Sequence, residues 1–163
     1  MYRGVLLDIS GVLYQDDEAL PGAVAAMRSL QVAGVAVRLV TNTSRRTAEA
    51  IFYELKRLGF ALEPEQLYTA PKAMLDYIEA RELRPYRLTH PCLDTEFARL
   101  DHSNPNAVVV CDAGERFDYQ SLNKAFQVLM NDEAELLAVG DNRYFRSRGR
   151  LHLDAGPFVK ALE

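Results

Sequence analysis

Short apolar runs alternate with helical patterns along the N-terminal part of the chain. Residues 3–8 form a nearly continuous apolar run that ends in a carboxylate, and residues 35–40 form a second such run. Runs of this kind are typical of parallel strands buried on both faces. After each run, apolar side chains recur three or four positions apart, which predicts helices over residues 22–34 and 44–58. The alternation of strands and helices predicts an α/β fold built on a parallel sheet.

The remainder of the chain continues this alternation and divides near residue 80. Pro71 is suited to the first turn of a helix, and residues 66–69 before it predict a third strand. The charged segment 81–85 interrupts the pattern, so we predict one region over residues 1–80 and a second, small α/β region over 81–163. In the second region we expect strands at 86–89, 107–111 and 136–139, helices at 94–100 and 122–130, and a hairpin turned by Gly149.

Polar residues follow the first two predicted strands. Asp8 ends the first run, and Thr41, Asn42, Thr43 and Ser44 follow the second. Asp8 and Thr41 are 33 positions apart, about the length of one strand-helix-strand unit, which places both at the carboxyl edge of a parallel sheet. Open α/β sheets carry their binding sites at this edge.

Composition and charge exclude several classes of protein. The chain has 163 residues, 48% of them hydrophobic, with 19 Lys and Arg against 23 Asp and Glu and a net charge of −4. This balance offers no basic surface for a nucleic acid, and no apolar run approaches the roughly 20 residues of a membrane span. The N-terminus lacks the pattern of a signal peptide, so we expect a cytoplasmic protein without nucleic-acid or membrane partners.

The polar segments have a structural and a chemical interpretation. Asp8 could simply cap the turn that follows it, and Thr43 or Ser44 could cap the next helix. Alternatively, hydroxyl, amide and backbone N–H groups before a helix N-terminus would bind an anion, with the Asp8 carboxylate beside it. A carboxylate next to a phosphate cradle predicts phosphoryl transfer through a covalent intermediate.

These segments resemble the haloacid dehalogenase-like (HAD) phosphatase superfamily. The segment 8–13 resembles its first motif and 39–43 its second, and the segments 103–106, 112–115 and 154–163 are similar to members with a C2-type cap. The resemblance implies a partial doubly wound, Rossmann-like parallel sheet as the core, with residues from about 80 onward forming the cap. It also implies a small phosphorylated substrate. In the cap, residues 141, 142 and 144 align loosely with a loop that faces the site.

The resemblance implies roles for particular residues. Asp8 would be the nucleophile and a Mg²⁺ ligand, and the backbone carbonyl of Ser10 would be a second ligand. Thr41 would hydrogen-bond the transferring phosphoryl group, with Asn42 and Thr43 in the same cradle.

Ser10 departs from the pattern of the superfamily. Most of its phosphatases carry a second Asp two residues after the nucleophile, as the general acid that protonates the leaving oxygen. A serine hydroxyl is too weak an acid for this role at neutral pH. Substrates whose leaving groups need little protonation, such as phosphoramidates and pyrophosphate, are therefore favoured over alkyl esters.

A second departure concerns the superfamily's third and fourth motifs, a lysine and an acidic cluster that follow the cap. Neither occurs before Glu163, and Lys160 lies in a predicted helix, where we expect it to face solvent. We therefore expect a C-terminally truncated chain with a weak Mg²⁺ site. The strand that bears Asp8 should also have an unpaired outer edge, so we expect a homo-oligomer or a partner that covers it, or a poorly stable fragment.

Three other interpretations remain beside this one. The chain could be a non-catalytic module that binds phosphate or a partner. A dinucleotide-binding enzyme is disfavoured because the first turn lacks GxGxxG. A metal site formed by His90, Cys92, His102 and Cys111 is disfavoured because these residues lack the close spacing of metal ligands.

Overall fold

The computed structural model describes residues 3–131, 133–147 and 149–163. By their contacts, these residues form two compact units, which are described separately below. The first contains the chain up to Thr43 together with Ala48–Ala70, and the second contains Ser44–Thr47 and Pro71–Glu163. The helix over residues 70–80 therefore belongs almost entirely to the second unit. The predicted domain boundary near residue 80 stays a prediction.

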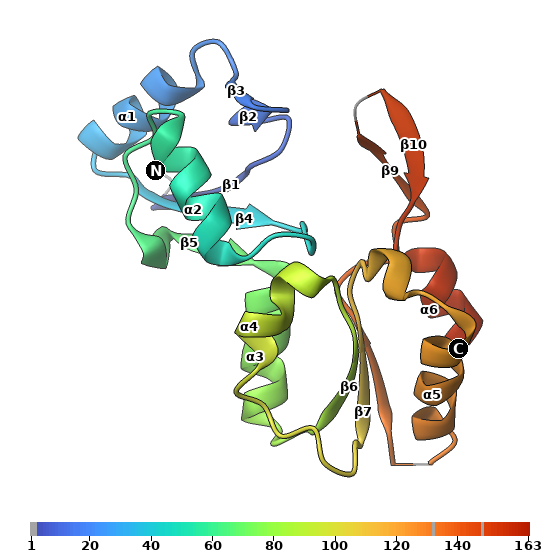
Figure 1. Ribbon diagram of the computed structural model, residues 1–163. Coiled ribbons are helices and arrows are strands. Elements are labelled where there is room, and N and C mark those ends of the chain that lie inside the picture. Colours follow the sequence, from blue (N-terminus) through green and yellow to red (C-terminus); the bar gives the residue numbers. More distant parts are fainter. Residues whose placement is uncertain (1–2, 132, 148) are drawn as a thin grey trace. The chain divides into compact units, whose positions relative to one another are not determined.

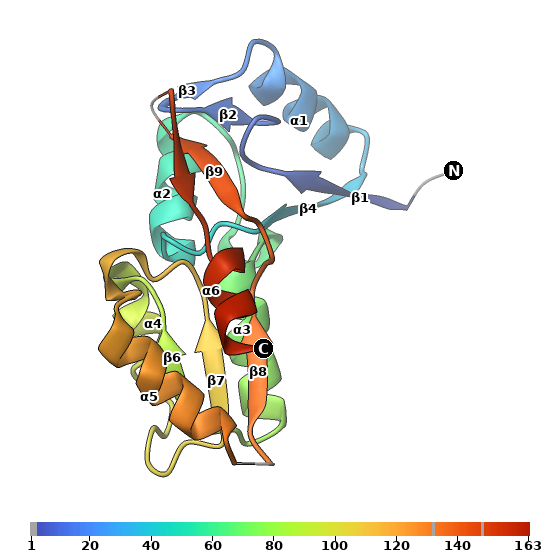
Figure 2. The ribbon, with the colours of Figure 1, turned by 90° about the vertical axis from the view of Figure 1, so that its right-hand side faces the viewer.

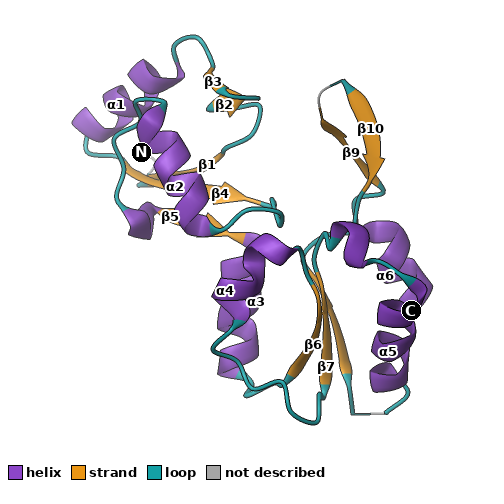
Figure 3. Ribbon diagram, viewed as in Figure 1, coloured by secondary structure: helices purple, strands orange, loops and turns teal. Residues whose placement is uncertain are grey.

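The first unit is built on a parallel sheet with the strand order β1-β4-β5 (Figures 1 and 3). Gly4 pairs with Ala36 and Leu39 with Leu67, in the direction expected for strand-helix-strand connections. Its elements are β1 (Gly4–Asp8), β2 (Tyr14–Gln15), β3 (Glu18–Ala19), α1 (Ala23–Val32), β4 (Ala36–Thr41), α2 (Ala48–Arg57), the short helix η1 (Pro64–Gln66) and β5 (Leu67–Thr69).

A single hydrophobic core lies on one face of this sheet. Leu39 of β4, Met27 of α1 and Leu55 of α2 are at most 2% exposed and belong to the same cluster. On the opposite face, Leu6 of β1 is 73% exposed, and β1 forms the edge of the sheet among the described residues. The prediction that this strand is buried on both faces is therefore wrong, whereas its unpaired outer edge and partly uncovered surface are confirmed.

The second unit has three layers, with a parallel sheet of order β6-β7-β8 between two pairs of helices (Figure 1). Helices α3 and α4 cover one face, and α5 and α6 cover the other. All four residues of β7 are fully buried, as expected for a central strand. The elements are α3 (Ala70–Ala80), β6 (Pro85–Leu88), η2 (Pro91–Leu93), α4 (Asp94–Phe97), β7 (Ala107–Val110), η3 (Gly114–Arg116), α5 (Tyr119–Leu129), β8 (Glu135–Ala138), β9 (Tyr144–Ser147), β10 (Arg150–Leu153) and α6 (Gly156–Leu162).

Strands β9 and β10 form an antiparallel hairpin beyond the layered part of this unit (Figure 2). Gly149, at the predicted turn, has φ of 75°, a left-handed conformation that glycine adopts without strain. The α/β class, the parallel pairing and the hairpin are thus confirmed. None of the helices formed by the described residues has the length and apolar character needed to cross a lipid bilayer.

Three helices differ from their predicted bounds by three residues or more, and one of them is α5, which begins at Tyr119 rather than at residue 122. Helix α2 begins at Ala48 rather than near residue 44, and α4 ends at Phe97 rather than at residue 100. In the case of α2, residues Ser44–Thr47 make their contacts with the second unit instead of forming the first turn of the helix. Apolar spacing detects the buried face of a helix, but these polar residues before α2 lie outside that pattern.

The two cysteines differ in exposure, which leads to a prediction about their reactivity. Cys111 is fully buried, and burial, with smaller contributions from Asp112 and Glu96, raises the pKa of its thiol to about 12, whereas Cys92 is exposed. The thiolate is the reactive form, so Cys111 should be almost entirely protonated at pH 8. Titration of the folded chain with a thiol-reactive disulfide should modify Cys92 rapidly and Cys111 only after unfolding. Rapid modification of two thiols without denaturant would contradict this.

Candidate functional site

The ends of β1 and β4 bring the candidate catalytic residues to one edge of the first unit's sheet. The parallel register places Asp8 opposite Val40, so Thr41 lies one residue further along the neighbouring strand. The predicted position of Asp8 and Thr41 at a common carboxyl edge is therefore confirmed.

A tight turn holds the Asp8 carboxylate at the end of β1. The Ile9 N–H donates to Asp8 Oδ1 at 2.8 Å, and the Ile9 carbonyl accepts the N–H of Leu13 at 2.8 Å. Ile9 and Leu13 are 1% and 3% exposed, so the core anchors both ends of the turn, and Gly11 between them adopts φ of 75°. Asp8 itself is exposed. The carboxylate is thus accessible on an anchored backbone, which is the arrangement that a nucleophile requires.

Ser10 lies within this turn with an exposed side chain. The Asp8 carboxylate and the Ser10 backbone carbonyl are oxygen donors, the type of donor that Mg²⁺ prefers. Among the described residues, no group of three or more His, Cys, Asp or Glu side chains is arranged to hold a metal ion. The donor chemistry of Asp8 and Ser10 is thus compatible with Mg²⁺.

The segment after β4 forms a compact polar turn. Thr41 is 8% exposed, and its Oγ1 accepts the Thr43 N–H at 3.2 Å, while Asn42 is exposed and Thr43 half-buried. The turn contains hydroxyl and amide groups, which are of the kind that can bind an anion.

The helix predicted to begin directly after this turn does not do so. Because α2 begins at Ala48, the prediction that Thr43 or Ser44 caps this helix is wrong, while anion binding by the segment Thr41–Thr43 stays a prediction. The Ser44 hydroxyl instead accepts the N–H of Asp112 at 3.0 Å.

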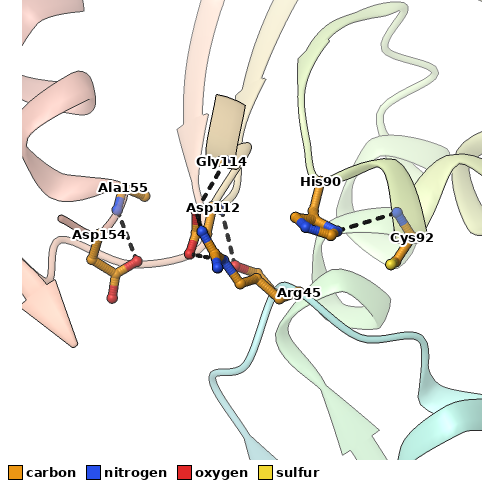
Figure 4. Close-up of polar contacts among 8 residues, drawn as sticks. Arg45, His90, Cys92, Asp112, Gly114, Asp154 and Ala155 are labelled. Atoms are coloured by element: carbon orange, nitrogen blue, oxygen red, sulfur yellow. Dashed lines mark hydrogen bonds and ion pairs between the residues drawn. The ribbon is translucent and has the colours of Figure 1, made fainter. Parts of the chain in front are cut away.

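Arg45 and Asp112 are the polar residues that sequence reasoning missed. Arg45 donates from Nε and Nη2 to the buried carboxylate of Asp112, although 67 positions separate the two (Figure 4). One signal could have drawn attention to Asp112, because it lies just beyond the carboxyl end of the buried strand β7, with only Cys111 between them, whereas Asp8 is the last residue of β1.

The alternative metal site is contradicted. The backbone N–H of Cys92 donates a hydrogen bond to His90 Nδ1 at 3.2 Å. Both ring nitrogens of His102 lie within 3.3 Å of backbone carbonyl oxygens. Cys111 is fully buried within a hydrophobic cluster. These side chains therefore do not converge on a common ligand position.

Two C-terminal predictions concern Lys160 and the loop before β9. Lys160 is exposed and pairs with Glu163 at 2.7 Å, which confirms that it faces solvent.

The side chains are exposed at three positions near the start of β9: Asp141, Asn142 and Tyr144. The Asn142 carbonyl accepts the Gly156 N–H at 2.9 Å. A substrate-facing role for these three residues stays a prediction.

Comparison with solved structures identifies the same fold in phosphatases. A 4-nitrophenylphosphatase from Thermotoga maritima matches 99% of the chain with a TM-score of 0.87 and 23% identity, over 63% of its own length. A p-nitrophenyl phosphatase from Archaeoglobus fulgidus matches 99% of the chain with a TM-score of 0.88 and 20% identity, over 64% of its length.

Sequence comparison gives nearer relatives. Phospholysine phosphohistidine inorganic pyrophosphate phosphatase is 42% identical in Homo sapiens over 166 residues and 47% identical in Bos taurus over 167 residues, in each case over 99% of the chain. The chain spans 62% of the length of these relatives. The family model for haloacid dehalogenase-like hydrolases matches residues 5–102, which include β1, β4 and the turns that follow them. The chain therefore belongs to the haloacid dehalogenase-like hydrolase family.

Proposed function

We propose that the chain is part of a Mg²⁺-dependent phosphohydrolase that uses Asp8 as its nucleophile. The observation that carries this proposal is the exposed Asp8 carboxylate on an anchored turn, at the same sheet edge as the polar turn Thr41–Thr43. Membership of a hydrolase family, in which named phosphatases are the relatives, supports it.

In the proposed reaction, a carboxylate oxygen of Asp8 attacks the phosphorus atom of the substrate. The bond from phosphorus to the leaving group breaks as the bond to Asp8 forms, which gives an aspartyl phosphate and releases the leaving group. Water then attacks the phosphorus, the bond between phosphorus and the Asp8 oxygen breaks, and inorganic phosphate leaves while the carboxylate is regenerated. The Thr41 hydroxyl, the Asn42 amide and donors of Thr43 hold the phosphoryl oxygens. A bound Mg²⁺ on Asp8 and the Ser10 carbonyl would neutralise charge on the phosphoryl group.

Ser10 indicates which substrates the site favours. It occupies the position from which the general acid acts in most phosphatases of the family, and its hydroxyl cannot supply a proton at neutral pH. The amine of a phosphoramidate can leave already protonated, and the leaving group of pyrophosphate is a stable anion. We therefore propose small phosphorylated substrates with P–N or pyrophosphate bonds, in agreement with the names of the mammalian relatives.

A substrate panel tests this preference. Phosphate release from phosphoramidate, pyrophosphate and an alkyl phosphate should be compared with Mg²⁺ and with a chelator. We expect release from the first two substrates to exceed release from the alkyl ester by at least about 100-fold, the contribution of a general acid. Replacing Ser10 by Asp should reduce this gap by accelerating the alkyl ester. Equal rates for alkyl esters and phosphoramidates would contradict the proposal.

A second candidate function is binding without turnover, through phosphate or through a partner. The exposed edge of β1 and the 73% exposed Leu6 favour it, because an unpaired strand edge with an apolar side chain invites pairing. We propose a further strand, from a second copy or from another chain, as the partner of this edge. Phosphate release that depends on Mg²⁺ and on Asp8 would support the hydrolase, whereas binding of phosphate or of a partner without any phosphate release would support the second function. A cytoplasmic location stays a prediction.

A further inference from the structure

A polar pocket with a volume of about 500 Å³ lies where the strands of the second unit's parallel sheet begin. Arg84 directly precedes β6, Asn106 directly precedes β7, and Glu133 lies two residues before β8. All residues that line the pocket belong to the second unit. The pocket is therefore at the amino edge of this sheet, whereas the sites of open α/β sheets generally lie at the carboxyl edge.

The guanidinium of Arg84 is held in place at this pocket by the loop before β7. Arg84 Nε donates to the carbonyls of Ser103 and Asn104, at 3.0 Å each. The backbone N–H of Arg84 donates to Asn106 Oδ1 at 2.7 Å, and the Asn106 N–H donates to the Arg84 carbonyl at 3.0 Å. Within the part of the chain that the structure describes, the two Nη groups make no hydrogen bond or ion pair. They are thus oriented donors that a ligand can use.

The loop that orients Arg84 is itself ordered by local hydrogen bonds. Asp101 Oδ1 accepts the Ser103 N–H at 2.8 Å and the Ser103 hydroxyl at 2.7 Å. These two bonds lower the pKa of the Asp101 carboxyl, so it is charged at neutral pH and keeps both of them. Asn104 adopts φ of 43°, a left-handed conformation that asparagine tolerates. The carbonyls that hold Arg84 therefore keep their positions without a ligand, which lowers the entropic cost of binding.

Amide side chains supply further donors around the pocket. The oxygen Oδ1 of Asn106 is already used by Arg84, and Asn131 Oδ1 accepts the Glu133 N–H at 3.2 Å. Each of these two asparagines therefore keeps its NH₂ group for a ligand. Gln127 of α5 adds an exposed amide that can both donate and accept.

The pocket also carries one charge of each sign. Among the described residues that line it, Arg84 has the one basic side chain and Glu133 the one acidic side chain. The two do not form an ion pair with each other, and within the described chain the Glu133 carboxylate makes no hydrogen bond. Pro105 and Val128 contribute a small apolar surface. Two unpaired opposite charges on one pocket favour a ligand that itself carries both charges.

We propose that this pocket binds a free α-amino acid. Its carboxylate accepts a two-pronged hydrogen bond from the Nη groups of Arg84, the geometry for which a guanidinium is suited. Its ammonium group donates to the Glu133 carboxylate. A simple anion would be repelled by Glu133, and a neutral sugar would use neither charge. This inference does not rest on the proposed phosphohydrolase function, because none of its residues belongs to the site proposed for that function.

The test titrates the ¹⁵N-labelled chain with L-glutamine, whose side-chain amide complements the amides of Asn104 and Gln127. The side-chain NH₂ signals of Asn106 and Asn131 should shift, with a dissociation constant of about 1 mM or below. Glutaramate lacks the ammonium group and L-glutaminamide lacks the carboxylate, and each should bind at least about tenfold more weakly. The absence of saturable shifts up to about 20 mM L-glutamine would overturn the proposal. Equal binding of glutaramate or of glucose would overturn it as well.

Glu133→Gln tests the ammonium contact without disturbing the loop that holds Arg84. This variant should bind L-glutamine about tenfold more weakly than the wild type, but glutaramate with the same affinity as the wild type, because glutaramate has no ammonium group. Glu115→Gln is the matched control, since Glu115 is an exposed carboxylate of the same unit in the short helix η3, and it should leave both affinities within about twofold. Unchanged L-glutamine affinity in Glu133→Gln would contradict the proposal, and so would an equal loss for both ligands.

Discussion

Replacing Asp8 by asparagine is expected to abolish Mg²⁺-dependent phosphate release, with a loss of roughly a thousandfold or more. The amide cannot attack phosphorus as a carboxylate does, and it removes the anionic ligand from the proposed Mg²⁺ site. Asn can still accept the hydrogen bond that Ile9 donates to Asp8 Oδ1, so the turn after β1 should keep its shape. The measurement is phosphate release from phosphoramidate by the wild type and the variant, with and without Mg²⁺.

Asp16→Asn serves as the matched control for this experiment. Asp16 is an exposed carboxylate in the turn between β2 and β3, with φ of 53°, a conformation that asparagine tolerates well. The control should retain wild-type phosphate release, and both variants should keep the thermal unfolding midpoint of the wild type. Retention of most activity by Asp8→Asn would exclude Asp8 as the nucleophile.

Replacing Gly156 by alanine is expected to destabilise the second unit by about 3 kcal/mol, because it forces atoms into occupied space. A Cβ at this position would lie 2.6 Å from the Asn142 carbonyl oxygen and 2.7 Å from the Asp141 carbonyl oxygen. Both are backbone atoms, which cannot move aside as a flexible side chain can. The Gly156 N–H also bonds to the Asn142 carbonyl, so a shift that relieves the clash would weaken this hydrogen bond.

Gly140→Ala is the control, because a Cβ at Gly140 would meet no atom within 4 Å and the residue does not adopt positive φ. Urea unfolding of the two variants should show a large loss of stability for Gly156→Ala and a change of less than about 0.5 kcal/mol for Gly140→Ala. Equal stability of the two variants would contradict the close approach of the chain at the start of α6.

The position of the candidate site at the carboxyl edge of the first unit's sheet can be predicted from the local sequence pattern alone. Two apolar runs separated by one helical pattern specify parallel strands, and parallel strands align their carboxyl ends. The pattern is therefore sufficient to place Asp8 and Thr41 together, and the register of β1 and β4 confirms this placement. The hairpin at Gly149 is predictable for a similar reason, since its signal lies in a few adjacent residues.

The contacts around the cradle could not be predicted in this way. The bond from Arg45 to Asp112 joins residues 67 positions apart, and nothing in the pattern near Arg45 indicates a partner. The same contact explains why α2 begins at Ala48, because Ser44–Thr47 are held elsewhere. The exposure of Leu6 was also missed, since an apolar run predicts a buried strand but does not show what covers each of its faces.

The most direct test of the account is chemical identification of the residue that becomes phosphorylated. The chain should be mixed with phosphoramidate and Mg²⁺, quenched in acid and treated with borohydride, which reduces an aspartyl phosphate to homoserine. Peptide mass mapping is predicted to find homoserine at position 8 and at no other aspartate, and to find none in Asp8→Asn. Phosphate release without modification of Asp8, or modification at another residue, would contradict the central claim.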